Sequence, residues 1–425
     1  MYQHCFILVI QGKSSVARNN FIKHTIPKRT GASITRNILI KHGQSKKIIE
    51  SVMVLPINRA FVLFLLLGVL TFSSCHVGRF IYWNFADIND FKKFPLDTLR
   101  KAPPLYHFKY SGMPCKINLP ETLKTKEAST TFEEFLASKH TKAFLIIRND
   151  SILYEKYFDR LDHTTIFPGF SITKSMLSAL VGIAIDEGYI KSVYQPVTDF
   201  LPELKDKKFQ KVTIEDLLSM RSGIRFVEGY SNPFGGMAKF YYGRNLRKYA
   251  LKLKIESEPG KVYKYQSANF QLLAMVVEKA TGKRISEYLE EKIWKPVGME
   301  FNGTWNVDSK KFRENKGFCC INARSVDFAR FGQLYLNGGK MNDLQLIPED
   351  WVRESLMIRN DSRDSQGFPY TYFWRVLENG DFFAKGILGE FIYVCPLKKV
   401  VIVRIGDKSA DFVWPDFFRE ILTQL

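Results

Sequence analysis

Two groups of strand-like apolar runs lie far apart in the chain and constrain its fold more than any other feature. Residues 142–158 read KAFLIIRNDSILYEKYF, two apolar runs on either side of Asn149-Asp150-Ser151, and this pattern is typical of a β-hairpin. Residues 381–406 hold three further runs, separated by Gly386–Gly389 and by Pro396–Lys399. Because neither group can bury its apolar face alone, we expect the two groups to meet in one sheet.

The chain between these groups has the pattern of helices. Examples are FQLLAMVVEKATG at 270–282, whose last glycine suits a helix C-terminus, and SVDFARFGQLYLNGG at 325–339. The terminal stretch DFFREILTQL predicts one more helix, packed on the sheet. The expected fold class is therefore α+β: an antiparallel sheet built from N- and C-terminal strands, flanked by helices, with an inserted mainly helical lobe.

A charge-free apolar run near the N-terminus predicts the location of the protein. Residues 60–72 read AFVLFLLLGVLTF, preceded by Arg59 and followed by Ser73-Ser74-Cys75. A short apolar run with a basic flank is typical of a signal peptide. Its end resembles a bacterial lipoprotein cleavage site, which makes Cys75 the lipidation candidate. An uncleaved membrane anchor remains the alternative, because the apolar run, extended beyond residue 72, approaches the roughly 20 residues that span a bilayer.

Both alternatives predict an extracytoplasmic protein, on the periplasmic side or the cell surface, attached to a membrane through residues 60–75. Residues 1–52 fit neither alternative, and Met53 would begin an ordinary signal peptide. We therefore expect residues 1–52 to be a non-structured extension or a wrongly assigned start. Residues 53–75 are then the signal peptide or anchor, residues 76–140 a lead-in segment, and residues 141–425 the globular domain.

The formal net charge of +19 raises the possibility of nucleic-acid binding. Residues 1–52 hold nine basic residues and one acid, and the remaining excess is spread along the chain, as in KDKKFQK at 205–211. No nucleic-acid-binding motif accompanies it. We therefore expect solvated charged faces, or attraction to an anionic membrane surface, and no nucleic-acid partner.

The histidines and cysteines exclude several kinds of hydrolase. No histidine follows His163, so the C-terminal part of the chain cannot supply a Ser-His-Asp triad, and zinc ligands are lacking. None of the six cysteines has C-x-x-C spacing, so no metal site is predicted. Cys319 and Cys320 are adjacent, and we do not expect them to bridge each other. A hydrolytic base would have to be a lysine, a tyrosine or a carboxylate.

The tetrapeptide Ser171-Ile172-Thr173-Lys174 opens the strongly apolar segment SMLSALVGIAIDEG, which has the pattern of a buried helix. Ser171 and Lys174 would share one face of that helix, with the serine near the N–H groups of its first turn. Burial removes hydration from a lysine ammonium and so favours the neutral amine, which can activate a serine nucleophile. A capping serine beside a snorkelling lysine would give the same tetrapeptide.

Two later motifs favour the catalytic interpretation. Tyr265-Gln266-Ser267 stands just before the helix at 270–282, and Lys385-Gly386-Ile387-Leu388-Gly389 lies between two predicted strands. With these three motifs the chain resembles the serine β-lactamase-like, or penicillin-binding, family. That family includes class C β-lactamases, D-alanyl-D-alanine carboxypeptidases, carboxylesterases and 6-aminohexanoate-oligomer hydrolases.

The family has Ser-x-x-Lys at the start of a buried helix, Tyr-x-Asn before a second helix, and Lys-Thr-Gly or a glycine-containing substitute on a strand. The segments LLSMRSGI at 217–224 and INARSVDFARFGQLYLNGG at 321–339 also resemble it. The resemblance covers about residues 140–425. It implies that Ser171 forms an acyl-enzyme, that Lys174 takes the serine proton, and that Tyr265 relays a proton to the leaving group. It implies no cofactor.

The resemblance also implies an oxyanion hole made by the backbone N–H groups of Ser171 and Ile387, with Gly386 allowing close approach of the strand. Two positions depart from the family pattern. Ser267 stands where Tyr-x-Asn has its asparagine, and Ala384-Lys385-Gly386 aligns with Lys-Thr-Gly, so that the cation is shifted by one residue. On a strand this shift turns Lys385 to the opposite side. Both departures resemble the esterase and amide-hydrolase members.

Two aromatic stretches are candidates for lining a substrate pocket, although aromatic clusters are also common in protein cores. They contain Tyr230, Phe234, Tyr241, Tyr242, Tyr370, Tyr372 and Trp374.

The expected function is a metal-independent serine hydrolase that cleaves a small ester or amide, or a peptide, through an acyl-enzyme on Ser171. A β-lactamase, or a D-amino-acid peptidase of cell-wall fragments, is the alternative within the same chemistry. A non-catalytic penicillin-binding-type recognition module is the alternative outside it. The oligomeric state stays open.

Overall fold

The computed structural model describes residues 76–83, 85–112, 116–124, 131–409 and 412–425. The predicted signal peptide or anchor, with Cys75, lies outside the described residues. Among the helices of the described residues, none combines the length and apolar character needed to cross a bilayer.

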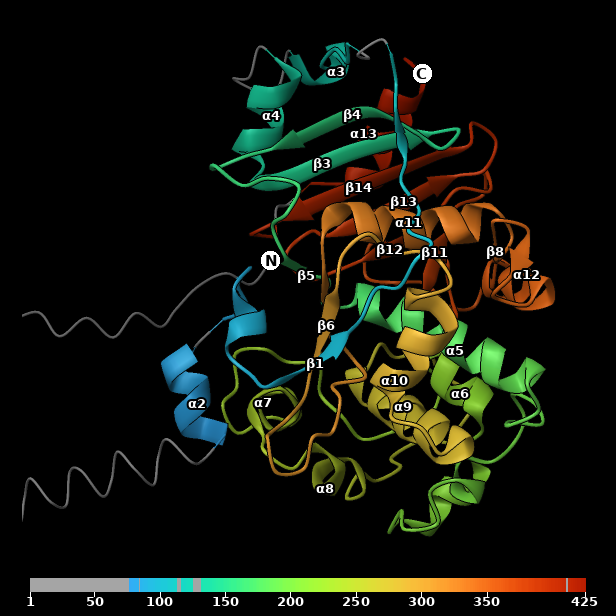
Figure 1. The fold of residues 1–425 in the computed structure, drawn as a ribbon. Coiled ribbons are helices and arrows are strands. Elements are labelled where there is room, and N and C mark those ends of the chain that lie inside the picture. The colour runs from blue at the N-terminus through green and yellow to red at the C-terminus, as the bar shows by residue number, and fades with distance from the viewer. Residues whose placement is uncertain (1–75, 84, 113–115, 125–130, 410–411) are drawn as a thin grey trace, which may run out of the picture. The chain divides into compact units, whose positions relative to one another are not determined.

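An eight-stranded sheet forms the upper layer in Figure 1 and joins both ends of the globular chain. The ladders are antiparallel except at the short edge strand β2, which runs parallel to β4. In spatial order the strands are β10 (Tyr370–Thr371), β11 (Trp374–Val376), β12 (Phe382–Lys385), β13 (Phe391–Cys395), β14 (Val400–Gly406), β3 (Thr141–Arg148), β4 (Ser151–Tyr157) and β2 (Lys109–Tyr110).

The central ladder of this sheet joins the two predicted strand groups. β14 pairs with β3 from Val400 opposite Arg148 onward, so the last strand of the chain lies beside the first strand of the hairpin. Asn149 and Asp150 connect β3 to β4 with positive φ angles of 48° and 59°, which suit a tight hairpin turn. The predicted α+β fold, with a sheet closed by both ends of the domain, is confirmed.

Helices cover both faces of the sheet. On one face, α4 (Phe132–Ser138) and α13 (Trp414–Leu422) pack through an aromatic cluster that includes Phe144 and Phe418. On the other face, α11 (Ser325–Leu336) crosses β13 and β14. Gly332 of α11 lies so close to the sheet that a Cβ there would stand 2.7 Å from Ile392 Cγ2, so the helix is held tightly against the strands.

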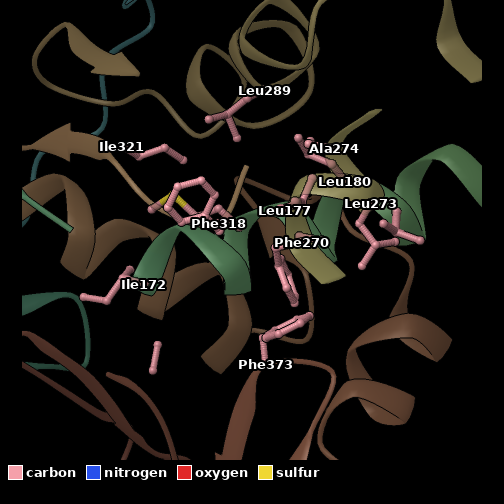
Figure 2. Packing of buried hydrophobic residues seen from close by; sticks show 14 of the residues in the cluster. Ile172, Leu177, Leu180, Phe270, Leu273, Ala274, Leu289, Phe318, Ile321 and Phe373 are labelled. Carbon is pink, nitrogen blue, oxygen red and sulfur yellow. The ribbon is translucent and has the colours of Figure 1, made fainter. Parts of the chain in front are cut away.

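The inserted lobe is built around two long buried helices, α5 (Ile172–Asp186) and α9 (Ser267–Thr281), which pack against each other. Figure 2 shows Leu177 and Leu180 of α5 beside Leu273 and Ala274 of α9. Gly282 ends α9 in the left-handed conformation, as its sequence predicts. Shorter helices complete the lobe: α6 (Ile214–Leu218), α7 (Gly236–Tyr242), α8 (Leu246–Ala250), α10 (Ile285–Leu289) and, beside α5, α12 (Glu349–Ser355).

The lead-in segment packs along the side of the domain. A second sheet has the order β1 (Leu96–Leu99), β6 (Gly303–Asn306), β7 (Ile321–Ala323) and β5 (Phe167–Pro168), and it joins the lead-in to distant parts of the chain. The remaining elements are α2 (His76–Trp83), α3 (Glu121–Lys124), and the pair β8 (Lys340–Met341) and β9 (Leu344–Gln345). Short 3-10 turns occur at Asp90–Lys92, Val197–Asp199 and Lys207–Lys211, and a π-helical turn occurs at Glu290–Trp294. β5 ends just before Ser171, so this sheet positions the start of α5.

We predict that Gly182→Ala destabilises the protein, although alanine is ordinarily favoured over glycine in a helix by about 0.5–1 kcal/mol. A Cβ at Gly182 would stand 2.2 Å from Cγ of Trp351, a ring of α12 that is itself buried. Overpacking of this kind costs about 1–3 kcal/mol. Urea denaturation should therefore show a lower free energy of unfolding for the variant.

A double-mutant cycle with Trp351→Leu provides the control. Removing the ring should relieve the clash, so the two substitutions together should cost less than their sum. Strict additivity, or a Gly182→Ala variant more stable than the parent, would contradict the packing described here.

Candidate active site

Ser171 lies at the N-terminal end of α5, immediately after a sharp turn. Phe170 has a positive φ of 41°, and a Cβ at Gly169 would stand 2.8 Å from the ring of Phe328, so the chain turns there in very little space. The Ser171 side chain is partly accessible. This strand–turn–helix geometry presents its hydroxyl at the edge of the buried helix, beside the N–H groups of the first turn.

Lys174 is only 2% exposed, one turn further along α5. Its Nζ donates hydrogen bonds to Oγ of Ser171 (2.8 Å) and to the backbone carbonyl of Phe318 (2.6 Å). It also lies 5.3 Å from the ring centroid of Tyr265. The lysine is thus held against the serine by an oxygen from a distant loop, which no motif in the sequence indicated.

The hydroxyl of Tyr265 completes the group, because it donates to Oγ of Ser171 at 3.0 Å. Tyr265 is placed by its neighbour Gln266, whose Nε2 donates to the carbonyls of Ile224 (2.9 Å) and Phe226 (2.6 Å). The three residues from the first two motifs therefore meet at one oxygen atom. A lysine amine and a tyrosine phenol both within reach of a serine hydroxyl are groups that can move its proton.

Ile387 and Gly386 lie in the turn between β12 and β13. Among the described residues, neither the N–H of Ser171 nor that of Ile387 has a hydrogen-bond acceptor within the protein. Ser171 and Ile387 line both of the cavities that open at this place. Two unpaired N–H groups beside a serine hydroxyl are donors of the kind that an oxyanion hole requires.

The side chain of Glu390 packs against this turn. The buried carboxylate accepts a hydrogen bond from the N–H of Leu388 at 3.1 Å, and a Cβ at Gly386 would stand 2.2 Å from Oε2 of Glu390. Burial raises the pKa of the Glu390 carboxyl to about 8. Glycine at 386 is therefore required by the space that this carboxyl occupies.

An apolar cavity of about 220 Å³ opens on one side of Ser171 and Lys174. Tyr230, Tyr241 and Tyr242 line it, as the aromatic stretches predict, together with Phe80 and Phe85 from the lead-in segment. Ser267 also lines this cavity, but its Oγ donates to Oε1 of Glu228 at 2.6 Å. The remaining aromatic candidates lie elsewhere: Phe234 is exposed, and Tyr370, Tyr372 and Trp374 are buried in the core.

A polar cavity of about 460 Å³ also opens at Ser171, next to Tyr265, and shares Tyr230, Ile387 and Ser409 with the apolar cavity. Asp364 and Arg375 line it as an ion pair at 2.5 Å. Ala384 packs into the core beneath the sheet, and Lys385 lies on the opposite side of the strand. Lys385 nevertheless reaches the polar cavity, where Nζ donates to Oε1 of Gln366 at 2.6 Å and burial lowers its pKa to about 8.

Cys319 and Cys320 form a disulfide, so the expectation that adjacent cysteines would not bridge is wrong. The backbone of Cys320 adopts a positive φ of 81°, a conformation that a sequence pattern does not indicate for cysteine. Cys319 lines the apolar cavity, directly after the residue whose carbonyl binds Lys174. No group of metal-ligating side chains occurs among the described residues.

The chain is similar to known proteins. The sequence profile of the Beta-lactamase family matches residues 129–409. A 6-aminohexanoate-dimer hydrolase from Paenarthrobacter ureafaciens is 28% identical over 305 residues, covering 67% of this chain and 75% of that protein. The esterase EstB of Burkholderia gladioli is 26% identical over 190 residues, covering 40% of this chain and 48% of that protein.

Among solved structures, a Bacillus anthracis protein proposed to be a 6-aminohexanoate-dimer hydrolase aligns with a TM-score of 0.68 and 22% identity. The alignment covers 78% of this chain and 90% of that protein. The sequence match spans most of the domain that contains Ser171, Lys174 and Tyr265. The chain therefore belongs to the beta-lactamase family of hydrolases.

Proposed function

We propose that the protein is a serine hydrolase that cleaves a small ester or amide through an acyl-enzyme on Ser171. The observation that carries the proposal is the meeting of Lys174 Nζ and the Tyr265 hydroxyl at Oγ of Ser171, at 2.8 and 3.0 Å. With a neutral amine at Lys174, the serine hydroxyl would donate its proton to Nζ as Oγ bonds to the substrate carbonyl carbon.

The negative charge that develops on the carbonyl oxygen would be stabilised by the N–H groups of Ser171 and Ile387. As the tetrahedral intermediate collapses, the bond to the leaving group breaks, and Tyr265 donates the proton that the leaving group needs while regaining one from Lys174. Water then attacks the acyl carbon, its proton returns through the same groups, and the free acid leaves with Ser171 restored.

Two observations favour an ester or amide hydrolase over a β-lactamase. The Ser267 hydroxyl at the Tyr-x-Asn position is bonded to Glu228, and Ala384 at the first position of Lys-Thr-Gly is buried in the core. Neither residue is available for the polar contacts that those motifs supply. Dominant cleavage of nitrocefin over simple esters by the full-length chain would reverse this preference.

We predict that Ser171→Ala and Lys174→Ala each reduce kcat for p-nitrophenyl butyrate by about 10⁴-fold or more, because each removes a group that acts in the same step. The matched control is Ser178→Ala, a buried serine on the same helix whose hydroxyl has no hydrogen-bond partner among the described residues. The control should keep parental turnover. Turnover that survives Ser171→Ala would contradict the proposed mechanism.

We predict that Tyr265→Phe affects substrates according to their leaving group. An alkoxide needs a proton as it departs, whereas p-nitrophenolate is stable without one. The loss in kcat should therefore be about 10²-fold or more for ethyl butyrate and clearly smaller for p-nitrophenyl butyrate. Equal losses on both esters would show that Tyr265 does not protonate the leaving group.

We predict that Glu390→Gln stabilises the protein at alkaline pH. The carboxyl has a pKa of about 8 in the folded protein against an ordinary value of 4.5, so the folded state holds a proton that the unfolded chain releases between these values. The free energy of unfolding should therefore fall as pH rises from about 5 to 8, by up to about 1.4 kcal/mol per pH unit.

Glutamine keeps an oxygen for the N–H of Leu388 but cannot ionise. Urea denaturation of parent and variant at pH 5 and pH 9 measures the effect. The variant should gain stability relative to the parent at pH 9 only, and a difference that does not change with pH would contradict the assignment.

A further inference from the structure

The apolar cavity beside Ser171 has a wall that lies outside the residues matched by the family profile. Phe80 of α2 and Phe85, which follows α2, line it, and both precede residue 129, where the match to the family begins. Met237 and Ala238 of α7, the helix against which α2 packs, also line it. The sequence motifs of the family therefore do not describe this part of the site.

The α2 part of this wall is packed in the fold, whereas Phe85 is 67% exposed. Phe80 is 8% exposed and meets the ring of Tyr242 edge-on, with 5.5 Å between the centroids. Trp83 of the same helix contacts Phe94 edge-on at 5.5 Å. Aromatic contacts of this kind stabilise the pair beyond the burial of apolar surface. α2 is therefore held against α7 by ring contacts along its inner side, and the cavity has a defined size.

Several polar side chains around the cavity already have partners. The Tyr241 hydroxyl donates to Asp90, and the Ser267 hydroxyl donates to Glu228. Lys174 Nζ contacts Ser171 and the Phe318 carbonyl. A charged or hydrogen-bonding acyl group would lose water there and find few free partners, whereas an apolar group would lose nothing.

The position of Tyr265 decides which part of the substrate enters this cavity. Tyr265 lines the polar cavity and does not line the apolar one. The group that receives its proton must lie on its own side. The leaving group therefore occupies the polar cavity, and the acyl group occupies the apolar cavity.

We propose that the lead-in segment sets the acyl selectivity of this enzyme, and that its substrates carry an apolar acyl chain seated against α2. The cavity of about 220 Å³ has room for about seven water-sized groups at about 30 Å³ each, so the best acyl chain has about four to eight carbons. The inference rests on the proposed serine-hydrolase function and adds the substrate class to it.

The test measures kcat/KM of the full-length chain for p-nitrophenyl acetate, butyrate, hexanoate and octanoate. These esters share one leaving group and differ in the apolar surface that they bury. kcat/KM should rise by up to about fourfold for each added CH2 until the cavity is filled, which corresponds to about 0.8 kcal/mol per buried methylene.

Two variants change the cavity in opposite directions. Ala238→Leu fills it, and the ratio of kcat/KM for hexanoate to that for acetate should fall about tenfold or more. Phe80→Ala enlarges it, and the best chain length should increase. The matched control is Tyr82→Ala on the same helix, whose side chain is 83% exposed and outside the cavity, and it should leave the ratio unchanged.

A parent that prefers acetate, or a chain-length profile that neither Ala238→Leu nor Phe80→Ala shifts, would overturn the inference while Ser171-dependent turnover kept the proposed function intact. Turnover that survives Ser171→Ala would instead overturn the proposed function, and the inference with it. The two failures are therefore distinguished by one set of esters.

Discussion

The buried amine of Lys174 is the group around which the site is organised. A charged or polar group without water is unfavourable unless it has hydrogen-bond partners, and Lys174 Nζ has two, Oγ of Ser171 and the carbonyl of Phe318. The serine lies one turn earlier on α5, the carbonyl comes from a loop far along the chain, and Tyr265 precedes α9. All three parts must be packed before the lysine is satisfied, so the site and the core of the lobe form together.

The sheet supplies the other half of the site through Arg404 of β14. The arginine is fully buried, and its guanidinium donates to the carbonyls of Gly389 and Lys139 and to the hydroxyl of Thr141. It thereby links the turn that carries Ile387 to the start of β3. Glu390 fills the space beneath the same turn. The N–H of Ile387 is therefore held in place by β12 and β13, which flank its turn, and by the β3–β4 hairpin through Arg404.

The sequence predicted those features that depend on local pattern. Apolar runs and turn residues located β3, β4, β12, β13 and β14, because alternation and turn chemistry are encoded within a few residues. The motifs around Ser171, Tyr265 and Gly386 named side chains that the structure brings together. This was possible because the residue spacing within a helix, or just before one, determines where each side chain points as well as where it stands in the chain.

Features that depend on distant contacts were not predictable. Nothing near Phe318 indicated that its carbonyl would bind Lys174, and the left-handed backbone of Cys320 that accompanies the disulfide has no sequence signature. Lys385 was expected to face away from the site and does leave the strand on the opposite side, yet its long side chain reaches the polar cavity. The wall made by α2 was missed for the same reason, since its position is set by aromatic contacts with α7.

The departures from the family pattern have a common physical consequence. An asparagine at position 267 could offer an amide to a substrate, whereas Ser267 gives its hydroxyl and its N–H to the two oxygens of Glu228. Ser267 and Glu228 already hydrogen-bond to each other, so a polar acyl group would have to displace one of these hydrogen bonds in order to make its own. In the proposed arrangement Phe80 and Met237 give the acyl side of the site a mainly apolar surface. The charged side chains lie on the side of the leaving group. In the proposed function Ser171 keeps the chemistry of the family, and in the inferred selectivity the acyl group is chosen by residues that lie outside the family motifs.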